Sequence, residues 1–417
     1  MAKPDPLPRN VAPALRSVLS EARVVALTGA RQTGKTTLVR AEAQRAGGRY
    51  VTLDDEAQRL AVARDPLGAL AGPYPLVIDE FQLGGDELLR AVKRLVDADD
   101  TPGRFLLTGS AHFLTIPRIS ESLAGRVALI DLWPLSQGEL RGRRDRFAER
   151  LFGSTAALRA IAPEPITPAA AFAAVEAGGY PEIRRLSPAR RRGWFSDYLR
   201  TITRRDVPTY ADLRRVDELP RLLRLLAART ACELNLAAVS RELGMARTTL
   251  DPYVAMLELV GLFTRVPAWS TSLTSKVVKH AKGHVADTGL AASLLGATAE
   301  TLGDPMHRAR GPLLETFVAL ELAKQRTWAK VPFDLHHFRD RELFEVDLVL
   351  EADDGRVAAV EVKAAQSVGE KDLRGLDGLA SRLGDRFVNG VLLYLGADVV
   401  PLGPRRTAMP LSALWAP

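Results

Sequence analysis

Short apolar runs alternate with amphipathic stretches along the first 140 residues of the chain. This rhythm predicts strands over 24–28, 49–53, 75–79, 104–109 and 127–132, with helices that begin near Lys35, Asp86 and Thr115. The runs at 75–79 and 104–109 are almost continuously apolar, which is typical of parallel strands covered on both faces. The pattern therefore predicts an α/β fold with a parallel sheet.

The pattern changes after the loop at 162–168, where helical segments follow. Over residues 236–263 two amphipathic stretches flank a short turn at Met245, with a candidate wing after Gly261. This order predicts a winged helix-turn-helix. Its second helix could present Arg247, Thr248, Thr249 and Tyr253 to nucleic acid, or it could clamp another part of the protein.

A second α/β section begins near residue 312. It is expected to contain a helix (312–326), strands (344–350, 357–363, 389–395) and a further helix (369–382). The chain is accordingly divided into an ATPase core (1–160), a helical lid (161–230), a winged helix-turn-helix with connector (231–310) and a C-terminal α/β domain (311–417).

The nucleotide chemistry is concentrated in the segment that joins the first strand to the first helix of the sheet. Residues 24–40 run VVALTGARQTGKTTLVR, which places the pattern G-x-x-x-x-G-K-[ST] between a strand and a helix. Backbone N–H groups of such a loop surround phosphates, Lys35 reaches the β- and γ-phosphates, and the Thr36 hydroxyl binds Mg²⁺. The predicted ATP-binding residues are Gly29, Ala30, Arg31, Gln32, Thr33, Gly34, Lys35, Thr36 and Thr37.

Three later positions complete a predicted hydrolytic site. Asp79 and Glu80 follow an apolar strand, where the first carboxylate can hold Mg²⁺ and the second can polarise water. Ser110, or its neighbour Thr108, follows the next strand and could orient that water. Arg126 could reach the γ-phosphate of a neighbouring subunit, or it could simply cap a helix end.

A second group of charged residues marks the C-terminal section. Glu361 and Lys363 lie two apart on a strand and share a face, and Asp347 on the adjacent strand and Glu315 on the preceding helix can join them. Acids that hold a metal beside a lysine suit phosphodiester hydrolysis, with Glu315, Asp347 and Glu361 as ligands. Alternatively, the charges lie on a solvent-exposed face of the strand.

Composition narrows the class of protein. Of 417 residues, 47% are hydrophobic and 26% charged, as in an ordinary globular protein. A single cysteine, Cys232, fits the cytoplasm, and we expect no membrane association. The net charge is +7, and residues 184–205 hold eight arginines and one acid, Asp197, which suits phosphate contact or a solvated or subunit-facing helix.

These motifs together resemble a known family. Gly29–Thr36, Asp79-Glu80, Ser110, SLAGR at 122–126, GGYPE at 178–182 and DTGL at 287–290 are similar to bacterial and archaeal AAA+ ATPases with an uncharacterised C-terminal domain. The resemblance implies roles in ATP hydrolysis for Lys35, Glu80, Ser110 and Arg126, and a sensor role for Arg184 or Arg185. The C-terminal section resembles the PD-(D/E)xK nuclease fold.

The sequence thus predicts an ATP- and Mg²⁺-dependent AAA+ ATPase that acts on, or is regulated by, DNA and forms a homo-oligomer. A nuclease site at the C-terminal acids is a candidate second activity. The alternative is a nucleotide-switched regulatory module with an inactive nuclease-like domain, and a third hypothesis is a remodeller of a protein partner.

Overall fold

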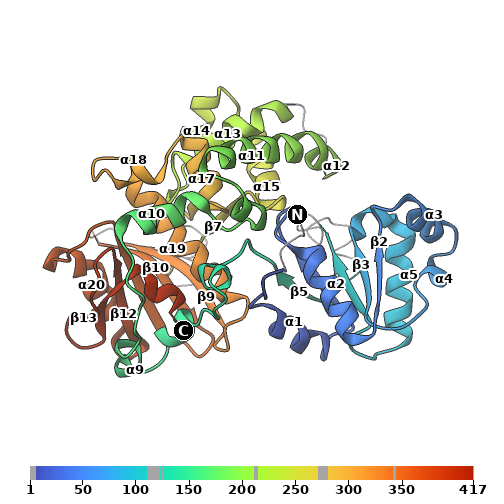
Figure 1. The fold of residues 1–417 in the computed structure, drawn as a ribbon, viewed down its shortest axis with the longest axis horizontal. Coiled ribbons are helices and arrows are strands. Elements are labelled where there is room, and N and C mark those ends of the chain that lie inside the picture. Colours follow the sequence, from blue (N-terminus) through green and yellow to red (C-terminus); the bar gives the residue numbers. More distant parts are fainter. Residues whose placement is uncertain are drawn as a thin grey trace. The chain divides into compact units, whose positions relative to one another are not determined.

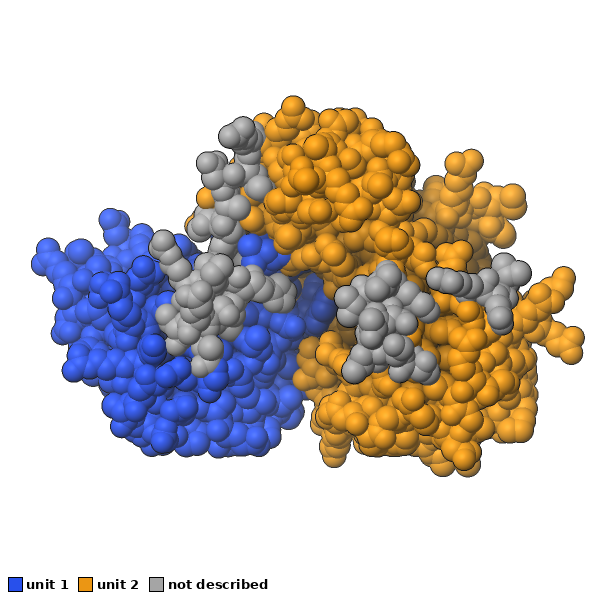
Figure 2. Space-filling view, turned by 180° about the vertical axis from the view of Figure 1, so that it is seen from behind, with its two compact units in different colours: residues 1–135, 259–261 blue, residues 136–258, 262–417 orange. Residues whose placement is uncertain are grey.

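The structure is a computed structural model that describes residues 6–109, 123, 125–210, 215–270, 280–340 and 344–416. It contains two compact units (Figure 2). The first comprises residues 1–135 and 259–261, and the second comprises residues 136–258 and 262–417. The finer division into four sections stays a prediction.

The first unit is built on a parallel five-stranded sheet (Figure 1). Its strand order is β2-β3-β4-β1-β5, so the strand before the P-loop lies in the interior of the sheet. The strands are β1 (Val24–Thr28), β2 (Arg49–Thr52), β3 (Leu76–Asp79), β4 (Phe105–Thr108) and β5 (Val127–Asp131). All five predicted strands are confirmed, with boundaries that differ by one residue at most.

Helices follow the strands in the α/β manner. They are α1 (Ala12–Leu19), α2 (Lys35–Ala46), α3 (Glu56–Arg64), α4 (Pro66–Ala69), the 3₁₀ turn η1 (Phe81–Gly84) and α5 (Gly85–Ala98). The helix starts predicted near Lys35 and Asp86 are confirmed. Leu88, Val92 and Val96 of α5 are buried in one cluster with Val24 and Phe105 of the sheet, because apolar residues recur on one helical face. The helix predicted near Thr115 lies outside the described residues.

The helical part of the second unit runs from Ser136 to Ala309. Its helices are α7 (Gln137–Leu140), α8 (Phe147–Leu151), α9 (Thr155–Arg159), α10 (Pro168–Ala177), η3 (Pro181–Arg185), α11 (Pro188–Thr201), the π-helical turn η4 (Ile202–Asp206), α12 (Val207–Tyr210), η5 (Val216–Glu218), α13 (Leu219–Ala227), α14 (Leu236–Leu243), α15 (Arg247–Leu259), α17 (Thr288–Leu295) and α18 (Ala299–Gly303). A three-stranded antiparallel sheet accompanies them, in the order β6 (Cys232–Glu233), β8 (Lys282–Val285), β7 (Phe263–Val266).

The two helices predicted over 236–263 are present as α14 and α15. Leu250, Val254 and Leu257 of α15 are buried, as their helical spacing predicts. Tyr253, one of the four candidate contact residues for nucleic acid, faces the protein interior instead. Its ring is buried, and its hydroxyl accepts a hydrogen bond of 2.8 Å from the backbone N–H of Arg215. The burial of a large aromatic ring stabilises the core, so this side chain packs inward.

The C-terminal part of the second unit is a six-stranded mixed sheet. Its order is β13-β14-β12-β11-β10-β9, with α19 (Arg310–Arg326) and α20 (Arg374–Leu383) packed against β11. The strands are β9 (Phe333–Arg339), β10 (Glu345–Ala352), β11 (Val357–Lys363), β12 (Phe387–Tyr394), β13 (Val400–Pro401) and β14 (Arg406–Pro410), and η6 (Glu370–Leu373), η7 (Gly384–Arg386) and η8 (Leu411–Trp415) are 3₁₀ turns. β9, β13 and β14 are strands beyond those that the sequence pattern predicts.

The GGYPE and DTGL segments form one buried junction within the second unit. Asp287 is 1% exposed and accepts hydrogen bonds from the backbone N–H groups of Gly179 (2.7 Å) and Leu290 (3.0 Å). It therefore caps α17 and holds the turn after α10. A Cβ added to Gly178 would lie 2.2 Å from the Asp287 carboxylate, so only glycine fits there.

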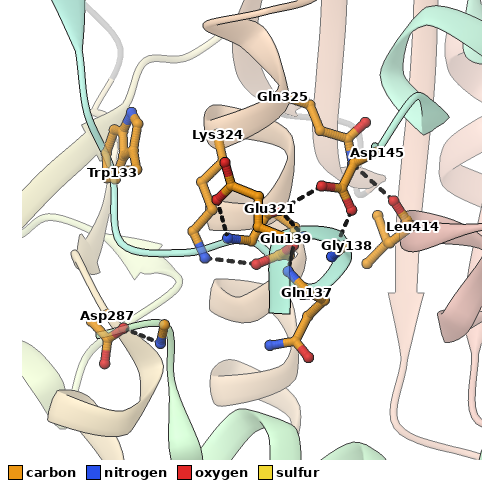
Figure 3. Close-up of polar contacts among 12 residues, drawn as sticks. Trp133, Gln137, Gly138, Glu139, Asp145, Asp287, Glu321, Lys324, Gln325 and Leu414 are labelled. Atoms are coloured by element: carbon orange, nitrogen blue, oxygen red, sulfur yellow. Dashed lines mark hydrogen bonds and ion pairs between the residues drawn. The ribbon is translucent and has the colours of Figure 1, made fainter. Parts of the chain in front are cut away.

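The first residues of the second unit are anchored on α19 by buried polar groups (Figure 3). Glu321 accepts from the backbone N–H of Gln137 (2.8 Å) and from Lys324 Nζ (2.6 Å). Gln325 accepts from the N–H of Ala148 and donates to the carbonyl of Leu414, which joins this segment to η8. Because a buried polar group requires a hydrogen-bond partner, these contacts fix where this segment lies on α19.

Candidate functional site

The P-loop wraps around its own lysine. Lys35, the first residue of α2, donates from Nζ to the carbonyl oxygens of Gly29 and Ala30, both at 2.8 Å. Gly29 has a φ of 144°, and a Cβ there would lie 2.2 Å from the carbonyl oxygen of Leu132. The loop therefore requires glycine at this position, and its backbone oxygens hold the Lys35 ammonium group.

Asp79 is the polar hub at the carboxyl edge of the sheet. It ends β3, is buried, and accepts hydrogen bonds from Thr36 Oγ1 (2.7 Å), Tyr50 Oη (2.8 Å) and Thr108 Oγ1. Thr108 ends β4, Tyr50 is the second residue of β2, and Thr36 lies in the first turn of α2. Because the carboxyl ends of parallel strands meet at one edge, residues far apart in sequence converge on one carboxylate.

Glu80 lies beside this hub in an uncommon backbone conformation. Its φ is 55°, and its carboxylate accepts a hydrogen bond from the side-chain amide of Gln82. Burial raises the pKa of Glu80 above its ordinary value, and the Gln82 amide opposes the shift. A half-buried carboxylate with a raised pKa at the end of a strand has the properties of a general base.

These residues fit a bound Mg²⁺-nucleotide. The glycine loop leaves no space for a side chain at Gly29, and a hydroxyl and a carboxylate, Thr36 and Asp79, lie within hydrogen-bond distance of one another. Hard oxygen donors of this kind are the ligands that Mg²⁺ prefers. When bound, the ion would neutralise the charge of the phosphates, and Lys35 would exchange its carbonyl partners for phosphate oxygens.

Some residues of this site could not be found from the sequence patterns. Arg9 donates to the carbonyls of Thr33 (2.8 Å) and Trp133 (2.7 Å), and so connects the start of the chain to the P-loop. Tyr50 contributes its hydroxyl to Asp79 from the neighbouring strand β2. Neither belongs to a local motif, so only the tertiary contacts reveal them.

Other predicted residues have different outcomes. Ser110 lies outside the described residues, whereas its alternative, Thr108, contacts Asp79. Arg126 forms an ion pair with Asp97 of α5, at 2.5 Å. Arg184 and Arg185 are exposed at the end of η3, with Arg185 3.8 Å from Glu182. The roles of Arg126, Arg184 and Arg185 stay predictions.

The C-terminal acids and lysine converge as predicted. Lys363 Nζ lies 3.2 Å from Glu361 Oε1, and Asp347 accepts a hydrogen bond of 2.9 Å from the backbone N–H of Val362. The first part of β11 is fully buried, which agrees with its apolar sequence. These contacts join β10 and β11 around a single group of charges.

A further lysine from another sheet enters this group. Lys282 of β8 is 3% exposed, and its Nζ lies 2.7 Å from Glu315, 2.7 Å from Glu345 and 3.6 Å from Asp347. Among the described residues, no three His, Cys, Asp or Glu side chains are arranged to hold a metal ion. The structure thus places an ammonium group among the predicted metal ligands.

The local electrostatics favour that ammonium. Burial opposes a charge on Lys282, but the carboxylates of Glu315, Asp347 and Glu345 outweigh it and raise the pKa. Burial and the nearby Asp347 raise the pKa of Glu361 to about 8. His284 lies on the same strand as Lys282, and burial, assisted by Lys282, lowers its pKa to about 3, so that ring is neutral.

Three known domain families match the chain. An AAA domain covers residues 21–141, and two domains of unknown function, DUF8612 and DUF4143, cover residues 171–301 and 310–414. The first match coincides with the parallel sheet and its P-loop. The N-terminal unit therefore carries a P-loop ATPase domain of the AAA class.

Two relatives match most of the chain and so show its family. An uncharacterized protein of Mycobacterium tuberculosis and one of Mycobacterium bovis are each 31% identical over 364 residues, which span 85% of this chain and 73% of theirs. The chain belongs to their family.

Solved structures resemble the chain more distantly. A Walker-type ATPase of Pyrococcus abyssi is 16% identical, covers 70% of this chain and 99% of its own, and gives a TM-score of 0.42. The RuvB Holliday junction branch migration motor of Thermotoga maritima is 19% identical, with coverages of 62% and 89% and a TM-score of 0.30. In the part of the chain that the structure describes, no helix is long and apolar enough to span a membrane.

Proposed function

We propose that this chain is a Mg²⁺-dependent ATP hydrolase that acts on nucleic acid. The observation that carries the ATPase part is the hub at Asp79, which joins Thr36, Tyr50 and Thr108 beside Glu80. In this proposal Lys35 holds the β- and γ-phosphates, Thr36 and Asp79 hold the ion, and Glu80 removes a proton from the attacking water. Ser110 or Thr108 orients that water.

The oligomeric state is also part of the proposal. Arg126 acts as a finger on the γ-phosphate of a neighbouring subunit, which requires it to leave Asp97 of its own chain. A site completed by a neighbour makes ATP turnover depend on assembly. We therefore propose a homo-oligomer as the active form.

A cavity rich in arginine supports a nucleic-acid partner. The second unit contains a cavity of about 840 Å³ between α11, η4, α13 and α17. Four arginines line it, against one acid, Asp217, and these arginines are Arg192, Arg200, Arg204 and Arg224. Arg200 is also paired with Asp197 at 3.1 Å. Guanidinium groups bind phosphate oxygens with directed hydrogen bonds, so the excess of positive charge that remains favours a polyanion.

The helices α14 and α15 offer a second contact surface. Arg247, Thr248 and Thr249 are exposed at the start of α15, and a hairpin of β7 and β8 follows, as in a winged helix. Because Tyr253 is buried, three of the four predicted contact residues remain available. These side chains could reach phosphates or base edges.

The nucleic-acid part is tested by retention on duplex and single-stranded DNA at low salt, with and without ATP. We expect Arg204→Ala to weaken binding and to reduce the slope of log affinity against log salt by about 0.9 for duplex DNA, the value for one lost phosphate contact. Arg308→Ala is the matched control, since Arg308 is exposed in the same unit but outside the cavity. Absence of retention by the wild type, or equal effects of the two variants, would refute this part.

One observation favours the second candidate, a nucleotide-switched module whose nuclease-like domain does not cut. It is the Lys282 ammonium among Glu315, Glu345 and Asp347. DNA incubated with Mg²⁺ or Mn²⁺ separates the candidates, because only an active nuclease should cleave it and lose cleavage in Lys363→Ala. ATPase activity stimulated by a polypeptide and insensitive to DNA would instead indicate a protein remodeller.

A further inference from the structure

The acid cluster of the C-terminal domain already contains a cation. Lys282 Nζ makes two contacts of 2.7 Å, to Glu315 and Glu345, and a third of 3.6 Å to Asp347. An ammonium group has three donors, which these three carboxylates can receive. Mg²⁺ would need the same oxygens at about 2.0–2.1 Å, in an octahedral arrangement centred where the nitrogen lies.

Two further carboxylate oxygens of the cluster are also engaged. Asp347 Oδ2 accepts from the backbone N–H of Val362 at 2.9 Å, and Glu361 Oε1 lies 3.2 Å from Lys363 Nζ. Lys363 is also 3.8 Å from Asp372. The predicted ligands are thus paired with N–H groups and ammonium groups instead of facing an open coordination site.

Lys282 is held in place by the backbone that carries it. It lies on β8, the middle strand of its sheet, and is in register with Glu233 of β6 and Val266 of β7. Two residues further along β8, the His284 ring lies 3.1 Å from the hydroxyl of Thr316 on α19. Since Glu315 and Thr316 are adjacent, α19 contacts β8 at two successive points, and the lysine is not a mobile surface side chain.

From this geometry we infer that Lys282 replaces the divalent metal ion of the nuclease-like site and fastens the three-stranded sheet to the C-terminal sheet. The residues present do not fit a divalent ion while Lys282 occupies the cluster. The wild-type site is therefore a metal-independent ionic lock. Removal of this one ammonium leaves Glu315, Glu345 and Asp347 facing one another, which is a set of oxygens that a divalent cation can use.

Mn²⁺ binding tests the inference, measured without nucleotide by the loss of the electron paramagnetic resonance signal of free Mn²⁺. We expect the full-length wild type and Asp347→Asn to bind Mn²⁺ equally, which shows that this cluster takes none. Lys282→Met should gain one Mn²⁺ site, and Lys282→Met combined with Asp347→Asn should lose it. Lys330→Met, the loss of an exposed lysine in the same unit, should gain no site.

Thermal unfolding gives an independent measurement. Lys282→Met should unfold at a lower temperature than the wild type in EDTA and recover part of that loss in Mn²⁺, whereas the wild type should unfold at the same temperature in both. Mn²⁺ binding by the wild type that Asp347→Asn abolishes would overturn the inference, even if Lys282→Met fails to fold. The inference does not rest on the proposed action on nucleic acid, since neither DNA retention nor ATP turnover enters these measurements.

Discussion

At the scale of single residues, the hub at Asp79 explains why the local motifs of the chain act together. The P-loop and the Asp79-Glu80 pair are each visible in the sequence, because their function depends on neighbours along the chain. Their meeting depends on the strand order, which places β4, with Thr108, between β1 and β3. Tyr50 depends on the strand order in the same way, and Arg9 reaches the loop of residues 29–36 from outside the sheet, so no local pattern predicts either residue.

Glu80→Gln tests the assignment of the general base. We expect ATP turnover to fall by about 10²- to 10⁴-fold, the usual contribution of a general base, while nucleotide affinity changes little because Lys35 and Thr36 are intact. Since burial raises the pKa of Glu80, wild-type turnover should also decline on the acid side at a higher pH than an ordinary glutamate would give. Steady-state turnover against pH and binding of a fluorescent nucleotide analogue measure both effects.

Glu87→Gln is the matched control for this prediction. Glu87 lies on the following helix, α5, and its exposed side chain pairs only loosely with Arg90, at 3.2 Å. Its loss should leave turnover and the pH profile unchanged. If Glu80→Gln retains more than about a tenth of wild-type turnover, less than the smallest usual effect of a lost base, another residue is the base.

At the scale of secondary-structure elements, two sequence motifs prove to be one structural junction. GGYPE ends α10 and DTGL begins α17, and the buried carboxylate of Asp287 joins them. In the sequence, only the family resemblance connects these motifs. Their separation along the chain, 108 residues between Gly179 and Asp287, hides the contact from any local pattern.

Substitution of Gly178 tests how tightly this junction is packed. Gly178 has φ 67° and ψ −158°, a region that is nearly restricted to glycine, and a Cβ there would collide with Asp287. We expect Gly178→Ala to lower the free energy of unfolding by about 2–4 kcal/mol, from backbone strain together with overpacking. Urea unfolding followed by tryptophan fluorescence measures the change.

Gly296→Ala supplies the comparison. Gly296 ends α17 with φ 67° and ψ 17°, an ordinary left-handed cap, and a Cβ there would meet nothing within 4 Å. Gly296→Ala should lower the free energy of unfolding by about 1 kcal/mol, which is the strain of the left-handed conformation alone. Equal losses in the two variants would show that the Asp287 junction tolerates a side chain.

At the scale of the whole molecule, the second unit depends on buried charges that a local pattern does not reveal. The segment after Ser136 is held on α19 by Gln137, Glu321 and Gln325 (Figure 3), and β8 is held there by Lys282. In both places polar groups distant in sequence satisfy one another. Such pairs fix which elements meet, because a buried group left without its partner is costly.

Asp145 makes the stability of this unit depend on pH. Burial, with the nearby Glu321 charge, raises the pKa of Asp145 from 3.8 to about 7, so the folded state binds this proton more tightly than the unfolded chain does. The resulting stabilisation is fully present below about pH 4 and is lost as the pH rises to about 7. It amounts to about 1.4 kcal/mol for each unit by which the pKa in the folded state exceeds the pKa in the unfolded chain.

Asp145→Asn should remove this dependence. The amide oxygen can accept from the N–H of Gly138, which lies 2.9 Å from Asp145 Oδ1, and the amide carries no charge at any pH. Ser136 Oγ, which donates to Oδ2 of the acid, would accept from the amide nitrogen instead. Relative to the wild type, the variant should therefore gain stability as the pH rises from about 4 to about 7 and change no further above that range. Chemical unfolding at several pH values measures the difference in stability between the variant and the wild type. For Asp385→Asn, a control at an exposed site, this difference should not change with pH.

The sequence by itself determined the α/β class of the first unit, its five strands, the P-loop and the Asp79-Glu80 pair. It also placed Glu315, Asp347, Glu361 and Lys363 in one region. These features follow from periodicity and spacing, which are properties of neighbouring residues.

Only the tertiary structure decided what occupies the C-terminal cluster. Lys282 lies 33 residues before Glu315 on a strand of a different sheet, and nothing in its local sequence distinguishes it from a surface lysine. Tyr253 shows the converse, since a residue predicted at a surface is buried. In both cases, elements distant in the sequence bury the side chain, and this burial decides its role. The burial depends on how sheets and helices pack together, which local periodicity does not specify.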